Sequence, residues 1–372
     1  MVPSGAAQAF VPDDPPAELP LGPTTIVTLA RAQHALGELS GISRRLVNPR
    51  LYAEALIRRE ALVSSRIEGT VATPGELARA EIGLGDAGDA REVSNFVDAI
   101  EHALRHVRRK GERISLPLLL ESHRVLMMRV RGGRETPGEF RMVQNWIGAG
   151  SGGIAAARFV PPPPQELPRL LTALERYVND DAAGLVDLPP LVRVAVAHYQ
   201  FETIHPFRDG NGRIGRLLVM LMLVRHGLLS GPVLPISTAI EGRKTEYMDR
   251  MLAVSLRGEW NDWVRFFLEC TADAAAGALA FLRKLERLRD DWYEKVQATR
   301  ASARLIKVVD ALFVRPVITI AEAGRIMQVT PAAAAAAVGK LERLAIITEV
   351  TGRKRDRTYY ARAIMTLLNQ DL

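Results

Sequence analysis

Residues 205–216 read His-Pro-Phe-Arg-Asp-Gly-Asn-Gly-Arg-Ile-Gly-Arg, a stretch with one imidazole, one carboxylate, one amide, three glycines and three arginines. Pro206 and the glycines disfavour a helix through its first half, whereas the apolar run 217–224 is typical of a helix. The stretch is therefore predicted to be a loop that leads onto a helix N-terminus. Backbone N–H groups at such a junction bind anions, because they lack intrahelical partners and the helix dipole favours negative charge.

Two arginines at the end of this stretch extend the same interpretation. Arg213 and Arg216 are three residues apart, so they share one helix face and can hold successive phosphates. The alternative is a Gly/Pro turn followed by solvated arginines, and for Arg208 alone we favour it. That alternative gives no reason for a histidine, a carboxylate and an asparagine between the glycines, so we interpret the whole stretch as a functional site.

The stretch resembles the signature of Fic/Doc proteins, His-Pro-Phe-x-(Asp/Glu)-Gly-Asn-Gly-Arg-x-x-Arg, and matches it at every defined position. Twelve residues with this many fixed positions form a specific motif, unlike a lone glycine pattern. The resemblance implies a mainly α fold, namely a Fic helical core with a β-hairpin flap. It also implies a protein adenylyltransferase, which moves AMP from ATP to a Ser, Thr or Tyr hydroxyl of a target protein and of itself.

The resemblance assigns roles within the loop. His205 is expected to be the general base for the target hydroxyl, because an imidazole titrates near neutrality. Asp209 is expected to bind Mg²⁺, which takes carboxylate and phosphate oxygens. Asn211, with the amides on either side of it, is expected to hold the α-phosphate, and the two arginines the outer phosphates. The full ATP-binding set expected from the sequence is Glu68, Gln200, His205, Pro206, Phe207, Arg208, Asp209, Gly210, Asn211, Gly212, Arg213, Arg216 and Tyr247. Gly212 stands where the Doc branch has a lysine, which favours AMP transfer over kinase-like chemistry.

A second motif lies far upstream of the loop. The apolar stripe of residues 51–68 predicts a helix, and Gly69 suits the position just past its end. Its final residues, Ser64 to Gly69, fit the pattern (Ser/Thr)-x-x-x-Glu-(Gly/Asn), which is similar to the inhibitory motif of autoinhibited Fic proteins. An ordinary helix end is the alternative. With the resemblance accepted, we expect Glu68 to pair with Arg216 and to inhibit AMP transfer.

Three further segments are interpreted around the same site. Tyr247 lies in a segment that resembles the wall of the Fic adenine pocket, with core packing as the alternative. Gln200, one helical turn before the loop, is expected to reach the nucleotide, whereas His198 is expected to be a buried structural residue. The runs 142–147 and 159–160, separated by glycines, predict a β-hairpin. The resemblance makes this hairpin the flap that aligns the target segment by main-chain pairing.

The C-terminal region has a different character. Helices are expected at 302–313, 320–327 and 331–344, followed by a hairpin whose tip, 352–357, is basic. This pattern predicts a winged-helix domain, for which DNA binding is the obvious function. The second helix of the motif, however, begins with a run of alanines that offer no hydrogen bonds to base edges. A protein-interaction or spacer module is therefore the alternative, and binding to nucleic acid stays open.

Composition sets the remaining expectations. The 372 residues are divided into an N-terminal arm and inhibitory helix (1–90), a catalytic core (91–273), a linker helix (274–300) and a winged-helix domain (301–372). This last region has eleven Lys/Arg against six Asp/Glu, most of the net charge of +7. A single cysteine fits a reducing compartment, and neither a signal peptide nor a membrane span is visible. We expect a cytoplasmic protein; a homodimer is left open.

Two rival functions are carried forward. The first is removal of AMP from a modified protein, by the same loop with Glu68 aligning a water molecule. The second is a DNA-binding regulator whose core only senses nucleotide, and the intact His205 and Asp209 argue against it. The sequence does not identify the target protein.

Overall fold

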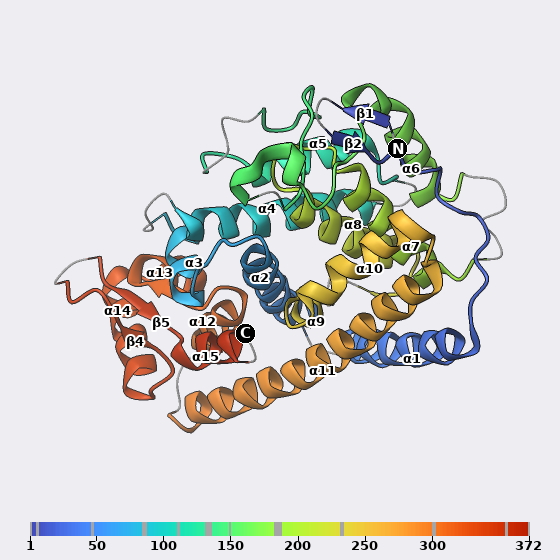
Figure 1. Ribbon diagram of the computed structural model, residues 1–372. Coiled ribbons are helices and arrows are strands. Elements are labelled where there is room, and N and C mark those ends of the chain that lie inside the picture. Colours follow the sequence, from blue (N-terminus) through green and yellow to red (C-terminus); the bar gives the residue numbers. More distant parts are fainter. Residues whose placement is uncertain are drawn as a thin grey trace.

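The computed structural model describes residues 2–4, 7–45, 48–83, 88–109, 112–130, 136–148, 150–181, 188–230, 234–299, 303–353 and 356–370, and it is mainly α-helical (Figure 1). The N-terminal half comprises β1 (Val2–Ser4), β2 (Ala7–Ala9), α1 (Pro23–Arg45), α2 (Pro49–Ile67), α3 (Pro74–Glu81), α4 (Asp89–Val107), α5 (Leu116–Leu126), the 3₁₀ turns η1 (Gly150–Ala156) and η2 (Pro164–Glu166), and α6 (Leu167–Val178). The C-terminal half comprises α7 (Pro190–Ile204), α8 (Asn211–Arg225), α9 (Ser237–Glu241), α10 (Lys244–Arg257), α11 (Trp260–Ala298), α12 (Ala303–Val314), β3 (Val317–Thr319), α13 (Ile320–Met327), α14 (Pro331–Arg343), β4 (Thr348–Glu349), β5 (Thr358–Tyr360) and α15 (Arg362–Asn369).

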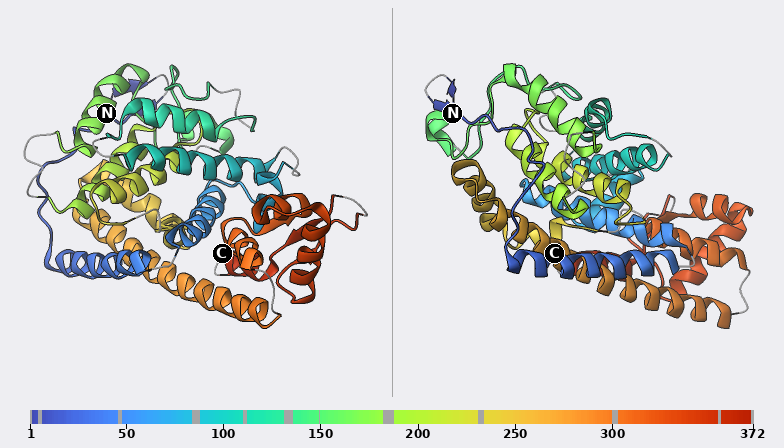
Figure 2. Two further views of the ribbon diagram at one scale, coloured as in Figure 1. Left: turned by 180° about the vertical axis from the view of Figure 1, so that it is seen from behind. Right: turned by 90° about the vertical axis from the view of Figure 1, so that its right-hand side faces the viewer.

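Helices α7 and α8 form the centre of the molecule. Both are apolar on nearly every face, so they are stable only where other helices surround them. Helices α2, α4, α5, α6 and α11 pack against this pair, and α10 lies on α11 beside it (Figures 1 and 2). The predicted loop, residues 205–210, joins the two central helices, so this packing fixes both of its ends.

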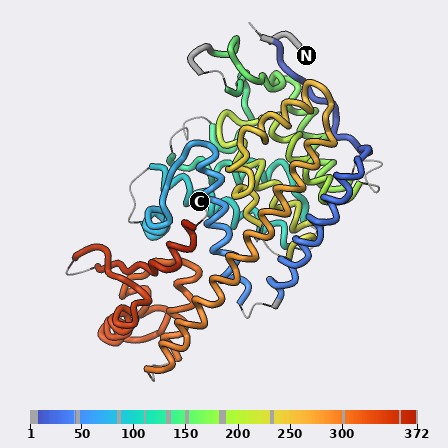
Figure 3. Tube along the Cα trace, turned by 60° about the horizontal axis from the view of Figure 1, so that its bottom comes forward, coloured from blue at the N-terminus to red at the C-terminus, as the bar shows by residue number. Residues whose placement is uncertain are grey.

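Helix α11 is longer than expected. The end of the expected core and the expected linker helix over 274–300 form one continuous helix in the structure, so the boundary expected at 273/274 falls inside it. Its apolar stripe continues without a break from Trp263 to Leu285, and no proline interrupts it. Helix α1 runs beside it, as the view from below shows most clearly (Figure 3).

The expected flap hairpin is reduced to a single β-bridge. Ile147 and Phe159 pair antiparallel, but no strand forms over 142–147 or 159–160, and η1 lies between the paired residues. Side-chain amides and guanidinium groups take carbonyls of this segment that a ladder would use, among them Val143 O and Pro161 O. The four prolines at 161–164 supply no N–H groups. Of the predicted hairpin, the structure contains only the antiparallel pairing of the two runs at Ile147 and Phe159.

The N-terminal arm lies along the body, as expected, but it includes a short hairpin of β1 and β2. Phe10 N–H donates to Val160 O at 2.9 Å, and the side chain of Gln200 donates to Asp13 O at 2.8 Å. The arm is thus attached beside the flap and the C-terminal half of α7.

The C-terminal region contains the expected helices and a small antiparallel sheet in the order β3-β5-β4. Helix α15 follows the sheet and was not predicted. Residues 354–355 of the expected basic tip lie outside the described residues, and the winged-helix assignment stays a prediction. Helices α12 and α15 pack on α2 and α3, so this region is docked on the predicted inhibitory helix (Figure 2). Of the helices that the structure describes, none combines the length and apolar character needed to cross a bilayer.

Candidate active site

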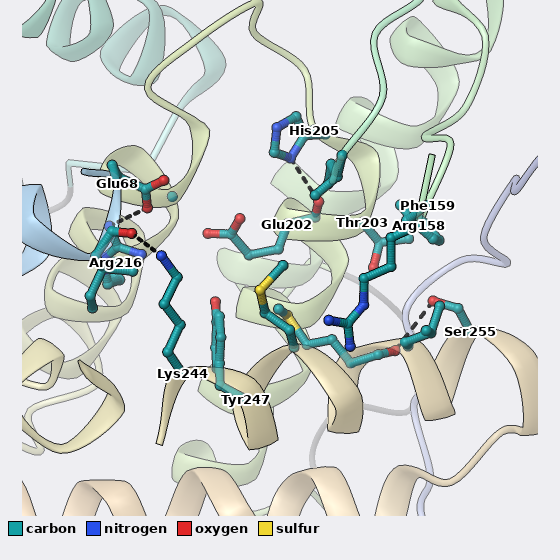
Figure 4. A pocket seen from close by; sticks show the side chains of 16 residues that line it. Glu68, Arg158, Phe159, Glu202, Thr203, His205, Arg216, Lys244, Tyr247 and Ser255 are labelled. Atoms are coloured by element: carbon teal, nitrogen blue, oxygen red, sulfur yellow. Dashed lines mark hydrogen bonds and ion pairs between the residues drawn. The ribbon is translucent and has the colours of Figure 1, made fainter. Parts of the chain in front are cut away.

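One cavity is lined by residues from the loop, the predicted inhibitory helix, the predicted flap and α10 (Figure 4). Its lining consists of Ile67, Glu68, Ile147, Arg158, Phe159, Glu202, Thr203, His205, Gly212, Arg216, Lys244, Tyr247, Met248, Met251, Leu252 and Ser255. One end is charged, with Glu68, Arg216 and Lys244. The other end is mainly apolar and is formed by α10 and the flap, with Arg158 at its edge (Figure 4).

His205 ends helix α7 in a left-handed conformation, with φ 48° and ψ 60°. This backbone conformation is uncommon for a residue with a side chain, and such residues concentrate at functional sites. Its Nδ1–H donates to Glu202 O at 3.2 Å, which leaves Nε2 as a proton acceptor. Burial lowers the pKa of His205 to about 4, so the imidazole is neutral at physiological pH.

The start of α8 has the backbone geometry on which the predicted anion site depends. Gly210 has φ 78°, and a Cβ there would lie 3.2 Å from Leu126 Cδ2 and 3.3 Å from Met127 Sδ. The backbone N–H of Ile214 donates to Gly210 O at 3.1 Å, and this is the first i→i−4 hydrogen bond of α8. The N–H groups of Asn211, Gly212 and Arg213 therefore stand at the helix start without an i−4 partner.

Asn211 uses its side chain on the loop itself. Its Oδ1 accepts from Phe207 N–H and its Nδ2 donates to Phe207 O, both at 2.8 Å. Both polar atoms thus hold the loop, and the second N–H of Nδ2 and the backbone N–H remain as donors. Pro206 is buried, and its carbonyl accepts the backbone N–H of Arg141. Arg208 lies exposed on the outside of the loop.

Asp209 meets the requirement for one Mg²⁺ ligand. Its side chain is 52% exposed, and Oδ1 accepts from Gly210 N–H at 2.6 Å. The described residues contain no group of three or more His, Cys, Asp or Glu side chains that could enclose a metal ion. Mg²⁺ bound mainly by substrate phosphates and water needs only one or two carboxylates, so the donor set fits that mode of binding.

Arg216 contacts the predicted inhibitory motif. Its Nε donates to Ser64 Oγ at 2.7 Å, and its second terminal nitrogen donates to Ser64 O at 3.0 Å and Glu68 Oε1 at 2.7 Å. Burial alone would raise the pKa of Glu68, but the Arg216 guanidinium outweighs this and holds that pKa below its usual value. Gly69 follows with φ 88°, as expected of the residue past the helix end.

Glu68 also lies directly over the start of α8. A Cβ on Gly212 would lie 2.1 Å from Glu68 Oε1, so the carboxylate fits only because this residue is glycine. Arg213 is placed differently, because its guanidinium pairs with Glu92 of α4 and lies 3.7 Å from Asp209 Oδ1. It is buried and does not line the cavity.

The remaining sequence candidates divide between the cavity and the core. Tyr247 lines the cavity, and its hydroxyl donates to His198 Nε2 at 2.8 Å while His198 Nδ1–H donates to Gly215 O. Burial lowers the pKa of His198 to about 3, as expected of a structural histidine. Gln200 does not line the cavity, because its amide holds the N-terminal arm at Asp13 O.

A family model described as Fic/DOC family matches residues 113–223, and one described as Fic/DOC family N-terminal matches residues 26–105. Together they span just over half of the chain. The chain belongs to the Fic/DOC family.

Curated relatives of this Fic/DOC chain include the protein adenylyltransferase Fic of Culex quinquefasciatus, 30% identical over 191 residues, or 50% of this chain and 34% of that protein. Protein adenylyltransferase fic-1 of Caenorhabditis elegans is 30% identical over 208 residues, or 54% and 37%. The chain thus spans about a third of the length of the curated relatives it matches.

Two solved Fic structures share the fold. A Fic family protein from Desulfovibrio desulfuricans G20 has a TM-score of 0.57 at 21% identity, covering 92% of this chain and 97% of that one. Fic-1 (residues 134–508) from C. elegans has a TM-score of 0.52 at 21% identity, covering 70% and 73%. The first likeness extends over the C-terminal region as well as the Fic/DOC core.

Residues that support the Fic/DOC loop were missed in the sequence. Arg141 is buried, and its guanidinium donates to the carbonyls of His205, Val143, Pro162 and Ile204. His123 stacks on Phe207 with ring centroids 3.9 Å apart, and its Nε2–H donates to Asp209 O at 3.1 Å. The contacts of Arg141 with His205 and Ile204, and of His123 with Asp209, join segments that are more than 60 residues apart, so no local pattern signals them. Glu202 did carry a signal, as the one carboxylate of a largely apolar helix.

Proposed function

We propose that this protein transfers AMP from ATP to a Ser, Thr or Tyr hydroxyl of a target protein, and to itself. The observation that supports it best is the neutral His205 imidazole, with Nε2 as acceptor, in one cavity with Gly212 and Arg216. The curated relatives named protein adenylyltransferase support the same reaction.

In the proposed reaction, the target hydroxyl gives its proton to His205 Nε2 as its oxygen bonds to the α-phosphorus of ATP. The bond from that phosphorus to the oxygen bridging to the β-phosphate breaks, and pyrophosphate leaves. The backbone N–H groups of Asn211 and Gly212 stabilise the charge that develops on the α-phosphate. Such transfer depends mainly on positioning and charge neutralisation, both of which a fixed loop supplies.

The side chains around the loop hold the rest of the nucleotide. Arg216 is the guanidinium at the charged end and receives the outer phosphates, whereas Arg213 adds positive charge behind Asp209. Asp209 would hold Mg²⁺, which neutralises phosphate charge when bound. Tyr247 and the methionines of α10 enclose the base.

Glu68 is proposed to inhibit this reaction. Its carboxylate occupies Arg216 and lies over Gly212, so it takes two of the groups that a triphosphate in the productive pose requires. ATP would then bind with its α-phosphate out of line with the incoming hydroxyl. A small misplacement of reacting atoms costs a large factor in rate.

Removal of AMP from a modified protein is the second candidate. The position of Glu68 favours it, because a carboxylate beside Gly212 could align a water molecule on the α-phosphorus. The two reactions predict opposite effects of removing this carboxylate, since an inhibitor raises AMP transfer when lost and a catalytic group lowers AMP removal.

The proposal includes the setting of the reaction. We place the protein in the cytoplasm, where a single buried cysteine suits the reducing environment. The division at residues 90, 273 and 300, with a winged helix after it, and a homodimer are retained as parts of the proposal. DNA affinity, if it exists, is assigned to the basic C-terminal region.

The test is incubation with labelled ATP and Mg²⁺, followed by mass spectrometry of this protein and of lysate proteins. AMP on hydroxyl side chains is expected with the wild type and with Glu68→Gly. His205→Ala should bind ATP but transfer at least 100-fold more slowly. Full transfer by His205→Ala, or no AMP on any protein with Glu68→Gly, would exclude the function.

A further inference from the structure

Glu202 is a carboxyl inside the cavity that the proposed reaction does not use. It lies on α7, three residues before His205, and its side chain points between the charged end and Tyr247 (Figure 4). It is only 9% exposed. A Cβ on Gly215 would lie 2.1 Å from Glu202 Oε1, so the carboxyl is placed against the backbone of α8.

No hydrogen bond to this carboxyl is found in the part of the chain that the structure describes. Among the described residues, none forms a hydrogen bond with Glu202 Oε1. The nearby Arg216 gives its hydrogen bonds to Ser64 and Glu68 instead. Burial raises the pKa of Glu202 to about 8, against the opposing effect of Arg216, so it is a neutral carboxylic acid at pH 7. Buried polar groups are nearly always paired, and one that faces a cavity indicates a ligand.

The position within the cavity indicates which part of a nucleotide it meets. Arg216 and Gly212 mark the phosphate end, and Met248 and Met251 mark the apolar end. Glu202 lies between them, and in any nucleotide the sugar lies between phosphates and base. A ribose offers two vicinal hydroxyls, each a donor and an acceptor, which match a carboxylic acid with one O–H and one carbonyl oxygen.

We propose that Glu202 hydrogen-bonds the ribose hydroxyls of ATP and thereby selects ribonucleotides over deoxyribonucleotides. This inference rests on the proposed use of ATP. A phosphate is a poor alternative partner, because its charge is matched by arginine and helix N–H groups rather than by a carboxyl. The apolar end already encloses a base without Glu202, which leaves the sugar.

The test is calorimetric titration of the full chain with ATP, 2′-dATP and 3′-dATP, for the wild type, Glu202→Gln and Glu202→Leu. The wild type should bind ATP about three- to tenfold more tightly than at least one deoxy analogue, the range of one hydrogen bond. Glu202→Gln, equal in length and neutral, should keep most of this ratio. Glu202→Leu should bind all three nucleotides equally.

The ratio is measured within each protein, so a general loss of stability does not imitate the effect. Gly215→Ala is a second variant, because its methyl displaces the Glu202 carboxyl and should also abolish the ratio. A wild type without preference, or a Glu202→Leu variant with the wild-type ratio, overturns the inference while ATP binding stands. Failure of both the wild type and Glu68→Gly to bind ATP overturns the proposed function together with it. A preference for ATP without AMP transfer supports the sugar contact and removes only the reaction.

Discussion

The guanidinium of Arg216 donates hydrogen bonds to Ser64 and Glu68. In the proposed function the same guanidinium binds the outer phosphates of ATP, so Glu68 and ATP compete for it. Glu68→Gly removes the competing carboxylate, and we expect AMP transfer to rise about tenfold or more, which is about 1.4 kcal/mol of barrier. The measurement is the initial rate of AMP incorporation at equal protein and Mg-ATP.

Two further variants test whether the charge of Glu68 and the freed Arg216 cause this rise. Glu68→Gln keeps the shape without the charge and should give a smaller rise than Glu68→Gly. The double variant Glu68→Gly/Arg216→Ala should lose the gain, because the freed guanidinium causes it. Equal rates for the wild type and Glu68→Gly contradict inhibition, and a lower rate favours a catalytic role for Glu68.

Arg141 holds the His205 loop through main-chain carbonyls and has no carboxylate partner among the described residues. Arg141→Leu leaves several buried carbonyls without a donor, and each unsatisfied carbonyl costs about 1–3 kcal/mol. We therefore expect the free energy of unfolding to fall by about 3 kcal/mol or more. Urea denaturation measures it. Arg50→Leu, at an arginine whose side chain is 80% exposed, is the control and should change stability by less than about 1 kcal/mol. If both variants changed the free energy of unfolding by less than about 1 kcal/mol, the stabilising role of Arg141 would be contradicted.

Several cavity residues were predicted from sequence, because the loop motif fixes the spacing of His205, Gly212 and Arg216. Two separate segments indicated Tyr247, which lines the same cavity, and Glu68, which reaches Arg216 as expected. Other side chains follow long-range contacts that spacing does not encode, so Asn211 turns back on its own loop and Gln200 reaches the N-terminal arm. Arg213 has a carboxylate of α4 within reach and is paired there.

At the scale of elements, the N-terminus of α8 depends on two glycines that face two glutamates. Gly212→Ala would place a methyl on the Glu68 carboxylate, and we expect it to lower the free energy of unfolding by about 1–3 kcal/mol. In the Glu68→Gly background the clash with the carboxylate is absent and only Arg216 Nη1, 2.9 Å from that Cβ at the end of a flexible side chain, has to shift, so the same change should cost less. Urea denaturation of the wild type, Gly212→Ala, Glu68→Gly and the double variant gives the coupling energy between the two residues. Additive effects would show that the carboxylate does not lie over Gly212 in solution.

Helices were predicted better than strands, for a physical reason. Helices α7 and α8 are specified locally by their apolar runs and by the Pro206 and glycine breakers between them. The flap has few residues able to complete a ladder, since glycines and prolines surround a single pair, Ile147 and Phe159. The continuity of α11 was missed because its exposed charges after residue 283 look like a new helix, although its buried stripe does not change.

For the whole molecule, buried groups with shifted pKa values predict a stability maximum between about pH 4.5 and 6.5. Burial lowers the pKa of His123 and His205 to about 4, so the unfolded chain binds more protons and stability falls below about pH 6.5. Burial raises the pKa of Glu60 to about 7 and of Glu202 to about 8, so stability falls as pH rises above about 4.5. Between about pH 4.5 and 6.5 the histidines and the carboxyls change stability in opposite directions. Below this window only the histidines act, and above it only the carboxyls act.

The measurement is the thermal unfolding midpoint of the full chain from pH 4 to 8.5. The midpoint should fall on both sides of the window. Glu60→Gln removes one of the carboxyls with a raised pKa and should flatten the alkaline side. A midpoint that climbs steadily from pH 5.5 to 8.5 would contradict the assignment.

The C-terminal region should bind DNA weakly and without sequence preference. The N-terminal alanines of α14 are mostly exposed and offer no base readout, whereas Arg353 and Arg357 can meet phosphates. Affinity of the full chain should therefore fall steeply between about 50 and 200 mM salt. Gel-shift titration with two unrelated duplexes measures it. Tight binding to one duplex alone at physiological salt would mean that α14 reads bases.

Helix α2 carries Glu68 at its end and is itself almost wholly enclosed. Its large buried apolar side chains are Leu51, Tyr52, Leu56, Ile57, Leu62, Val63 and Ile67. At about 1.5–3 kcal/mol each, withdrawing the helix would cost on the order of 10–20 kcal/mol, as much as unfolding a typical domain. The Glu68 side chain, 34% exposed, lies just past the last helical residue. The proposed block on Arg216 would therefore be relieved by rotation of the Glu68 side chain on a fixed support rather than by movement of the whole helix.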